Sequence, residues 1–232
     1  MSQPVCECIC RVRVFQSPRF LLPGFLLSCL LTCGCEEAGV PAETPIRFEA
    51  PGQALTALNP QHAALQKLGA FVVVVDGRVE SVRMNGAGVT DAAVANLADM
   101  VDLVFLDLSG SRITDDAMKH LSRLSKLTTL NLGRTQLTGA GLKFIGGLRS
   151  IEYLDLADTS VTDAGLEHLQ GLKRLKHLSI SGHGLTDAGL KRIADLEGLR
   201  ELSLIDTAVT QAAVDALSGT RPDLKVVLQR AP

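Results

Sequence analysis

Residues 151–174, IEYLDLADTSVTDAGLEHLQGLKR, carry the pattern that decides the fold of this 232-residue chain. Aliphatic residues fill its first, fourth, sixth and eleventh positions, and threonine fills the twelfth. The same pattern recurs on both sides of this stretch at a constant spacing of 24 residues. The first position is filled in turn by Val79, Leu103, Leu127, Ile151, Leu175 and Leu199. Six aligned copies without an insertion predict a repeat architecture over residues 79–222.

Each copy predicts one strand followed by one short helix. Its fourth and sixth residues are apolar with a period of two, which indicates a strand. Leu166, Leu169 and Leu172 then follow at a spacing of three, which indicates one face of a helix. Thr162 is expected to cap that helix, and Asp163 to lie at the positive end of its dipole. One copy cannot bury both apolar faces alone, so we expect the copies to stack.

The copies resemble the leucine-rich repeats of bacterial envelope proteins and of F-box-type receptors, over about residues 79–228. The resemblance implies an α/β fold, a leucine-rich-repeat solenoid (horseshoe). Its parallel β-sheet would form the concave face and its short helices the convex face. Many such repeats place asparagine at the ninth position, where it bonds the turning backbone. This chain carries Ala87, Ser111, Thr135, Thr159, His183 and Thr207 there, which leaves the turn geometry open.

The segments on either side of the repeats have the patterns of caps. Residues 61–78 combine two leucines with the apolar run 71–75, and Asp76-Gly77 predicts a hairpin turn. Residues 223–232 contain the run Leu224-Lys225-Val226-Val227-Leu228, which predicts a final strand and a short tail. We therefore expect an N-terminal cap at 61–78, six units of 24 residues at 79–222, and a C-terminal cap at 223–232.

The first 35 residues contain all six cysteines and predict an export signal. Three arginines precede the apolar stretch 20–32, which is too short to cross a bilayer of roughly 30 Å as a helix. Cys35 follows Gly34 and resembles the lipidation site of bacterial lipoproteins, with Cys33 and Cys29 as alternatives. An ordinary cleaved signal, an uncleaved anchor and a wrongly assigned start remain further alternatives. Residues 36–60 contain four prolines and are interpreted as a flexible linker.

Two columns of outward-pointing side chains mark the candidate binding surface on the predicted concave sheet. The third position of each copy gives Ser81, Phe105, Thr129, Tyr153, His177 and Glu201, and the fifth gives Arg83, Asp107, Asn131, Asp155, Ser179 and Ser203. Aromatic residues form only 3% of the chain, and binding hot spots favour exposed aromatics beside charges. The candidate protein-binding residues are Phe105, Tyr153, His177, Glu201, Asp107, Asn131 and Asp155. The alternative is that they are incidental surface residues.

Other kinds of site have weak support in the sequence. The aspartates that follow the threonines are interrupted by Gly139 and Gln211, and helix starts explain them better than calcium does. His168, His177 and His183 occupy three different repeat positions, so no metal or acid–base role is expected. No catalytic constellation or cofactor motif is present in the sequence, and none is predicted. The net charge of −2 without a basic run speaks against nucleic acid.

These observations predict a non-catalytic protein-binding module at the bacterial cell envelope, with the ligand on the concave sheet. The partner would be an unidentified protein or peptide, and a lipid anchor would attach the chain to the membrane. The alternative is a substrate-recognition subunit of a ubiquitin-ligase-like complex. That alternative needs an adaptor-binding helical domain before the repeats, and the linker at 36–60 offers none. An enzyme is a third class, for which no residue set was found.

Overall fold

A computed structural model describes residues 65–230 of the protein. The predicted signal at 1–35, the linker at 36–60 and the first residues of the N-terminal cap lie outside the described residues. The candidate lipidation residue Cys35 and its alternatives Cys33 and Cys29 lie there too. Within the described range, no helix is long and apolar enough to cross a membrane.

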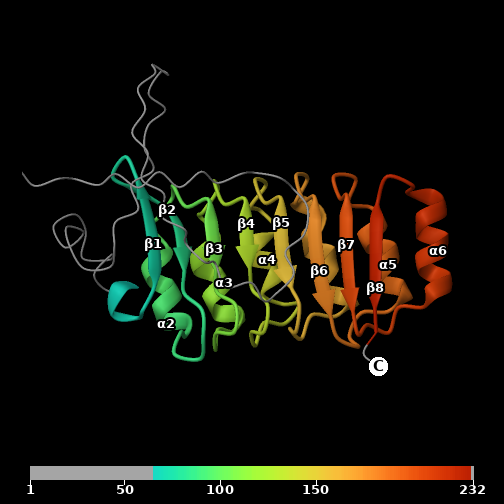
Figure 1. Ribbon diagram of the computed structural model, residues 1–232, viewed down its shortest axis with the longest axis horizontal. Helices are drawn as coiled ribbons and strands as arrows, with labels where there is room; N and C mark the ends of the chain where they lie inside the picture. The colour runs from blue at the N-terminus through green and yellow to red at the C-terminus, as the bar shows by residue number, and fades with distance from the viewer. Residues whose placement is uncertain (1–64, 231–232) are drawn as a thin grey trace, which may run out of the picture. The chain divides into compact units, whose positions relative to one another are not determined.

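Eight strands form a single sheet in the order of the sequence, as Figure 1 shows. They are β1 Phe71–Val75, β2 Arg78–Arg83, β3 Phe105–Asp107, β4 Thr129–Asn131, β5 Tyr153–Leu156, β6 His177–Ser181, β7 Glu201–Ile205 and β8 Lys225–Gln229. β1 is antiparallel to β2, and every later pair is parallel. Asp76 and Gly77 both have positive φ between β1 and β2, as a tight hairpin turn requires.

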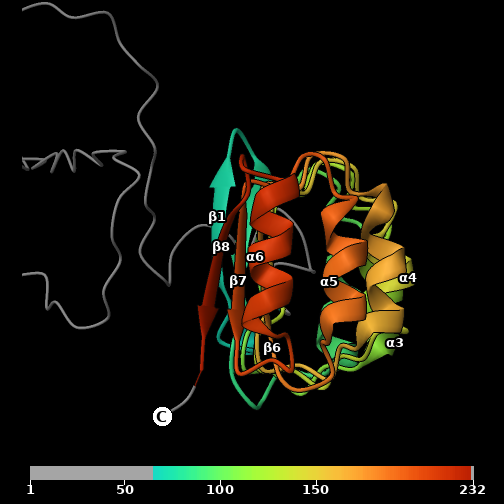
Figure 2. The same ribbon diagram turned by 90° about the vertical axis from the view of Figure 1, so that its right-hand side faces the viewer.

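One short helical segment follows each strand from β2 to β7, and Figure 2 shows these segments on one side of the sheet. They are α2 Asp91–Val94 with the 3₁₀ turn η2 Ala95–Leu97, α3 Asp115–Leu121, α4 Leu142–Ile145, the 3₁₀ helix η3 Asp163–Gly171, α5 Asp187–Ala194 and α6 Gln211–Thr220. A 3₁₀ helix has three residues per turn, so the spacing of Leu166 and Leu169 in η3 keeps both buried on one face. The predicted α/β solenoid with a parallel sheet is confirmed.

A single hydrophobic core runs through all copies between the sheet and the helices. The fourth residue of each copy lies at its centre, and Leu106, Leu130 and Leu154 are completely buried. Neighbouring copies align in register, with Leu106 beside Leu130 and Leu130 beside Leu154. Burial therefore depends on the adjacent copy, which explains why the array and not the single unit is the stable structure.

The aspartate after each threonine joins two copies, which corrects the interpretation of these residues as helix-start charges alone. Asp91 accepts hydrogen bonds from the backbone N–H and the hydroxyl of Thr114 in the next copy, both at 2.7 Å. The same two bonds join Asp115 to Thr138, Asp163 to Thr186 and Asp187 to Thr210. We call this set the Asp–Thr ladder.

The threonines cap fewer helices than the sequence predicts. The hydroxyl of Thr114 accepts from the N–H of Asp116, and the hydroxyls of Thr186 and Thr210 accept in a similar way. The hydroxyl of Thr138 accepts from the N–H of Ala140 in the turn before α4, whose N-cap is Gly141. Thr90 and Thr162 make no such capping bond. A hydroxyl that donates to the previous copy can accept from its own helix as well, so the ladder and the caps are compatible.

The ladder is interrupted between the third and fourth copies, where Gly139 replaces aspartate. Here the two backbones approach closely, because a Cβ atom added to Gly139 would lie 2.7 Å from the Cα of Gly165. An isolated parallel bridge between Thr138 and Ser160 joins the same two copies. Backbone contact therefore replaces the carboxylate at this junction.

In the second, third and fourth copies, the turn after the strand uses a hydroxyl group where many related repeats use asparagine. The hydroxyls of Ser111, Thr135 and Thr159 donate to the carbonyl three residues earlier, at 2.6–2.7 Å. Each bond satisfies a backbone acceptor at the bend. Ala87 and His183 have no hydroxyl at this position, and the buried hydroxyl of Thr207 has no hydrogen-bond partner among the described residues.

Candidate binding site

The outward face of the sheet, on the side away from the helices, carries both predicted columns. We call it the sheet face. Register pairs place Phe105 beside Thr129, Thr129 beside Tyr153, and so on to Glu201. The terminal strands extend the columns beyond the predicted set, because Lys225 of β8 lies beside Glu201 and Phe71 of β1 lies beside Arg83.

Four side chains at the C-terminal end of the sheet face form a connected series, which we call the tyrosine cluster. The rings of Tyr153 and His177 are 6.1 Å apart between centroids. The Nδ1 atom of His177 lies 3.2 Å from Oε2 of Glu201. The ammonium of Lys225 donates to the other oxygen of Glu201 at 2.7 Å. The structure thus brings together three residues that the sequence predicted, Tyr153, His177 and Glu201. Lys225 was not among the predicted residues.

The electrostatics of this cluster follow from its contacts. The hydrogen bond from Lys225 lowers the pKa of Glu201 below its ordinary value, and the contact with His177 acts in the same direction. Burial raises the pKa of the Tyr153 hydroxyl, and the charges of Asp155 and Glu201 raise it further. At neutral pH the cluster therefore offers an uncharged phenol beside an ionised carboxylate. A phenol of this kind is a hydrogen-bond donor and an apolar contact surface at once.

A second group lies at the N-terminal end of the sheet face, and we call it the phenylalanine cluster. The guanidinium of Arg83 lies 5.9 Å from the ring centroid of Phe105, and its Nε is 3.2 Å from a carboxylate oxygen of Asp107. Phe71, which is 53% exposed, pairs in register with Arg83. Arg83 therefore contacts one aromatic ring and one carboxylate and has Phe71 as its neighbour on β1, a combination that binding surfaces favour.

Three predicted residues of the second column also have a structural task. The side-chain oxygens of Asp107, Asn131 and Asp155 each accept a bond at 3.0 Å from the backbone N–H two residues later. These bonds shape the chain as it leaves the strand. Asp107 is only 8% exposed, so it offers a partner less surface than the others. Asp155 is half-buried and forms no ion pair with any described residue.

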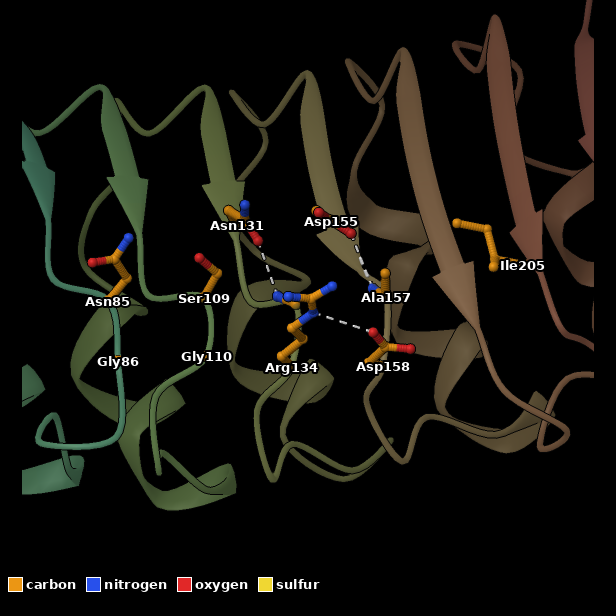
Figure 3. Close-up of a pocket in the computed structure, with 11 residues that line it drawn as sticks. Asn85, Gly86, Ser109, Gly110, Asn131, Arg134, Asp155, Ala157, Asp158 and Ile205 are labelled. Atoms are coloured by element: carbon orange, nitrogen blue, oxygen red, sulfur yellow. Dashed lines mark hydrogen bonds and ion pairs between the residues drawn. The ribbon is translucent and has the colours of Figure 1, made fainter. Parts of the chain in front are cut away.

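A groove of about 640 Å³ follows the carboxyl ends of β2 to β5, and the sequence did not predict it. Figure 3 shows Asn131 and Asp155 at its edge on the sheet, with Arg134 and Asp158 below them. The guanidinium of Arg134 lies 3.4 Å from the carboxylate of Asp158 in the next copy. The groove therefore joins the second column of the sheet face to the turns that follow the strands.

The eighth position of each copy forms this turn and has left-handed backbone in all six copies. The residues are Gly86, Gly110, Arg134, Asp158, Gly182 and Asp206. Gly86, Gly110 and Gly182 occupy the same repeat position, and this recurrence of glycine was the sequence signal for the left-handed conformation. The non-glycine residues at this position include Arg134 and Asp158 of the groove.

A smaller hollow of about 330 Å³ lies at the interrupted junction of the ladder, lined by Gly139, Thr162 and Gly165 among others. His168 also lines it, whereas His177 is on the sheet face and His183 is in a turn. Within residues 65–230, no three histidine, cysteine or carboxylate side chains are grouped as a metal site would require.

Sequence comparisons agree with this geometry. A model described as Leucine rich repeat matches residues 101–161, and a second of that description matches residues 173–194. Over these two stretches the chain is similar to leucine-rich repeats. Arrays of such repeats are generally protein-binding modules and are typically not catalytic. A comparison of the chain with curated protein sequences found no match.

Several solved leucine-rich-repeat structures are similar to the chain. An internalin C2 from Listeria monocytogenes is 27% identical, with a TM-score of 0.49 over 76% of this chain and 86% of the internalin. An internalin F from the same organism is 18% identical, with a TM-score of 0.48 over 73% of this chain and 54% of its own. A leucine-rich-repeat protein of Leptospira interrogans is 19% identical, with a TM-score of 0.44 over 57% and 33%.

Proposed function

We propose that the protein is a non-catalytic binding module whose sheet face holds a protein or peptide partner at the bacterial cell envelope. The observation that carries the proposal is the connected series of Tyr153, His177, Glu201 and Lys225 on the sheet face. Side chains that are already fixed by each other lose less freedom when a partner binds.

Two aromatic anchors at separate places on the sheet face support this assignment. Phe105 and Tyr153 lie in the same column with Thr129 between them. Adjacent strands are about 4.8 Å apart, so the two rings are roughly 10 Å apart along the sheet. A short peptide or the edge of a small domain can contact both. Asn131 and Asp155 in the neighbouring column would contribute polar contacts between the anchors.

Replacing Phe105 and Tyr153 together by alanine should abolish capture of the partner while the midpoint of thermal unfolding stays nearly unchanged. Both side chains lie on the outer face of strands whose core residues are unchanged, so the substitutions should weaken binding without lowering stability. Crosslinking from the sheet face in cells would identify the partner, and pull-down with the double variant would measure the loss.

The matched control replaces Thr129 and Ser179 of the same face by alanine, which removes little contact area. Capture by this control should remain close to that of the unchanged protein. Full capture by the Phe105 and Tyr153 variant would move the site away from the sheet face. Recovery of a ubiquitin-ligase adaptor as the partner would contradict the envelope assignment.

A further inference from the structure

The loops that lead from each helical segment into the next strand form a second surface. In the second, third and fourth copies these loops span residues 122–128, 146–152 and 172–176. Backbone hydrogen bonds tie them to their neighbours, from Glu152 to Thr128 and from Lys176 to Glu152, each at 2.8 Å. The three loops therefore lie side by side at one edge of the sheet, along the top of Figure 1.

Cations dominate these three loops. They carry Arg123, Lys126, Arg149, Lys173, Arg174 and Lys176, and the side chains of all six are exposed. We call this set the basic edge. Glu152 is the one carboxylate in the same loops, which gives a local charge of +5 in a chain of net charge −2. The corresponding loop before the basic edge holds Asp99 and Asp102, and the loop after it holds Asp195, Glu197 and Arg200, whose guanidinium pairs with Asp223.

Two of the six cations are already paired, and both pairs have the same form. Lys126 contacts Asp102 at 2.5 Å, and Lys176 contacts Glu152 at 2.6 Å. In each case the carboxylate belongs to the preceding copy. The side chains of the other four, Arg123, Arg149, Lys173 and Arg174, form no ion pair or hydrogen bond with any residue between 65 and 230. Arg174 also contributes to the lowered pKa of Glu152, and the four cations together give these loops an excess of positive charge that attracts anions.

We propose that the basic edge binds an acidic polypeptide segment, with several Asp or Glu carboxylates in a short run. The carboxylates of such a segment would occupy positions beside Arg149 and Arg174 like those that Asp102 and Glu152 occupy beside Lys126 and Lys176. Arginine binds a carboxylate through two parallel hydrogen bonds, which suits this role. The proposal does not depend on the partner proposed for the sheet face.

The size of the surface favours a short peptide over nucleic acid. Three strands at about 4.8 Å each span roughly 10–15 Å, which matches three to five residues of extended chain. Proteins that bind duplex DNA commonly neutralise about 6–10 phosphates, more than four free cations can contact. Carboxylates on the loops at both ends limit the contact to a short acidic run, so only part of an acidic octapeptide would contact the basic edge.

The test uses the full chain and a fluorescent octaglutamate peptide, with binding followed by anisotropy at low and at physiological salt. The probe should bind, and its affinity should fall as salt rises, because exposed charges are screened within about 8–10 Å. A variant with Arg149→Glu, Lys173→Glu and Arg174→Glu should bind at least about tenfold more weakly. Octaglutamine should not bind either protein.

A matched control variant carries Arg112→Glu, Lys143→Glu and Lys191→Glu. These residues are also exposed cations, and the control changes the net charge by the same amount but leaves the basic edge intact. It should bind octaglutamate nearly as well as the unchanged chain. Thermal unfolding of both variants checks that the array remains folded.

Three outcomes would overturn the proposal. They are equal binding by both triple variants, no binding of octaglutamate at low salt, and tighter binding of oligothymidine or anionic vesicles than of the peptide. The Phe105 and Tyr153 double variant should bind octaglutamate normally. A failure at the basic edge is therefore distinguishable from a failure at the sheet face.

Discussion

Arg134 has a backbone conformation that its side chain does not favour. Its φ is 59°, in the left-handed region that glycine adopts at the same position in three other copies. Aspartate at 158 and 206 tolerates this conformation better than most residues, because its short polar side chain can bond locally. Arg134 gains only an exposed ion pair with Asp158, which stabilises the fold little. Strained residues of this kind are concentrated at binding sites, and Arg134 lines the groove.

Replacing Arg134 by glycine should therefore stabilise the protein. Relief of left-handed strain gives about 1–2 kcal/mol, and the greater freedom of glycine in the unfolded chain takes back about 0.4–1 kcal/mol. We expect the free energy of unfolding to rise by about 0.5–1 kcal/mol, measured by urea denaturation.

Two glycine substitutions calibrate this measurement. Gly86 has a φ of 97° and no atom within 4 Å of an added Cβ, so Gly86→Ala should destabilise by about 1 kcal/mol through strain alone. Gly147 has the same open surroundings without a positive φ, and Gly147→Ala should not destabilise. If Arg134→Gly lowered the stability, the ion pair with Asp158 would outweigh the strain.

At the scale of the element, the Asp–Thr ladder fixes the position of each copy against its neighbour, which neither helix propensity nor apolar spacing determines. It ties the start of one helical segment to the start of the next through one carboxylate and two donors. Bonds to a charged group are stronger than those between neutral groups. The ladder therefore sets how far each copy shifts against its neighbour, while the core sets only that they pack.

A double-mutant cycle on Asp91 and Thr114 should show this coupling. Asp91→Ala removes both bonds and should cost about 1–3 kcal/mol, whereas Thr114→Val keeps the N–H and should cost about 1 kcal/mol. In urea denaturation, the double variant should lose about 0.5–1 kcal/mol less stability than the sum of the losses in the two single variants.

Asp116 supplies the control for this cycle. It lies in α3, the helix that Thr114 caps, and its side chain forms an ion pair with the exposed Lys119. Asp116→Ala should lower the free energy of unfolding by less than about 0.5 kcal/mol. Additive effects of the Asp91 and Thr114 changes would mean that the ladder bonds contribute independently of each other.

The sequence predicted the parts of the structure that depend on period alone. Apolar residues at a 24-residue spacing determine which side chains are buried, and alternation within the strand then places Phe105 and Tyr153 on the sheet face. The partner of Asp91 could not be predicted in this way, because it lies 23 residues away and depends on how the copies stack. The groove depends on the turn at position eight, and only the glycines at 86, 110 and 182 indicated its conformation.

At the scale of the whole molecule, the described residues place distinct surfaces on one rigid array. The sheet face carries the phenylalanine cluster at one end and the tyrosine cluster at the other, and the basic edge lies at the start of β4, β5 and β6. A continuous core holds these surfaces in fixed relation. A tether at the N-terminus would leave all of them free to meet partners, which is the arrangement that a lipid anchor at Cys35 would produce.

Metabolic labelling with a fatty acid analogue tests that anchor. The unchanged chain should incorporate label and fractionate with membranes, and Cys35→Ser should lose both properties, because the thiol at 35 is the proposed attachment point. Cys29→Ser serves as the comparison and should keep both. Label retained in the Cys35 variant would exclude Cys35 and leave Cys33 and Cys29 as candidates.

The interruption at Gly139 has a consequence for how this protein could gain or lose length in evolution. Removal of residues 127–150 would delete one whole copy and leave the 24-residue spacing of the remaining copies unchanged. Asp115 would then face Thr162, which has the same position as its present partner Thr138, and the ladder would become continuous. Phe105 would come to lie beside Tyr153, so two separate aromatic anchors would merge into one. The third copy therefore also sets the distance between the two aromatic anchors, besides carrying Asn131, Arg134 and Arg149.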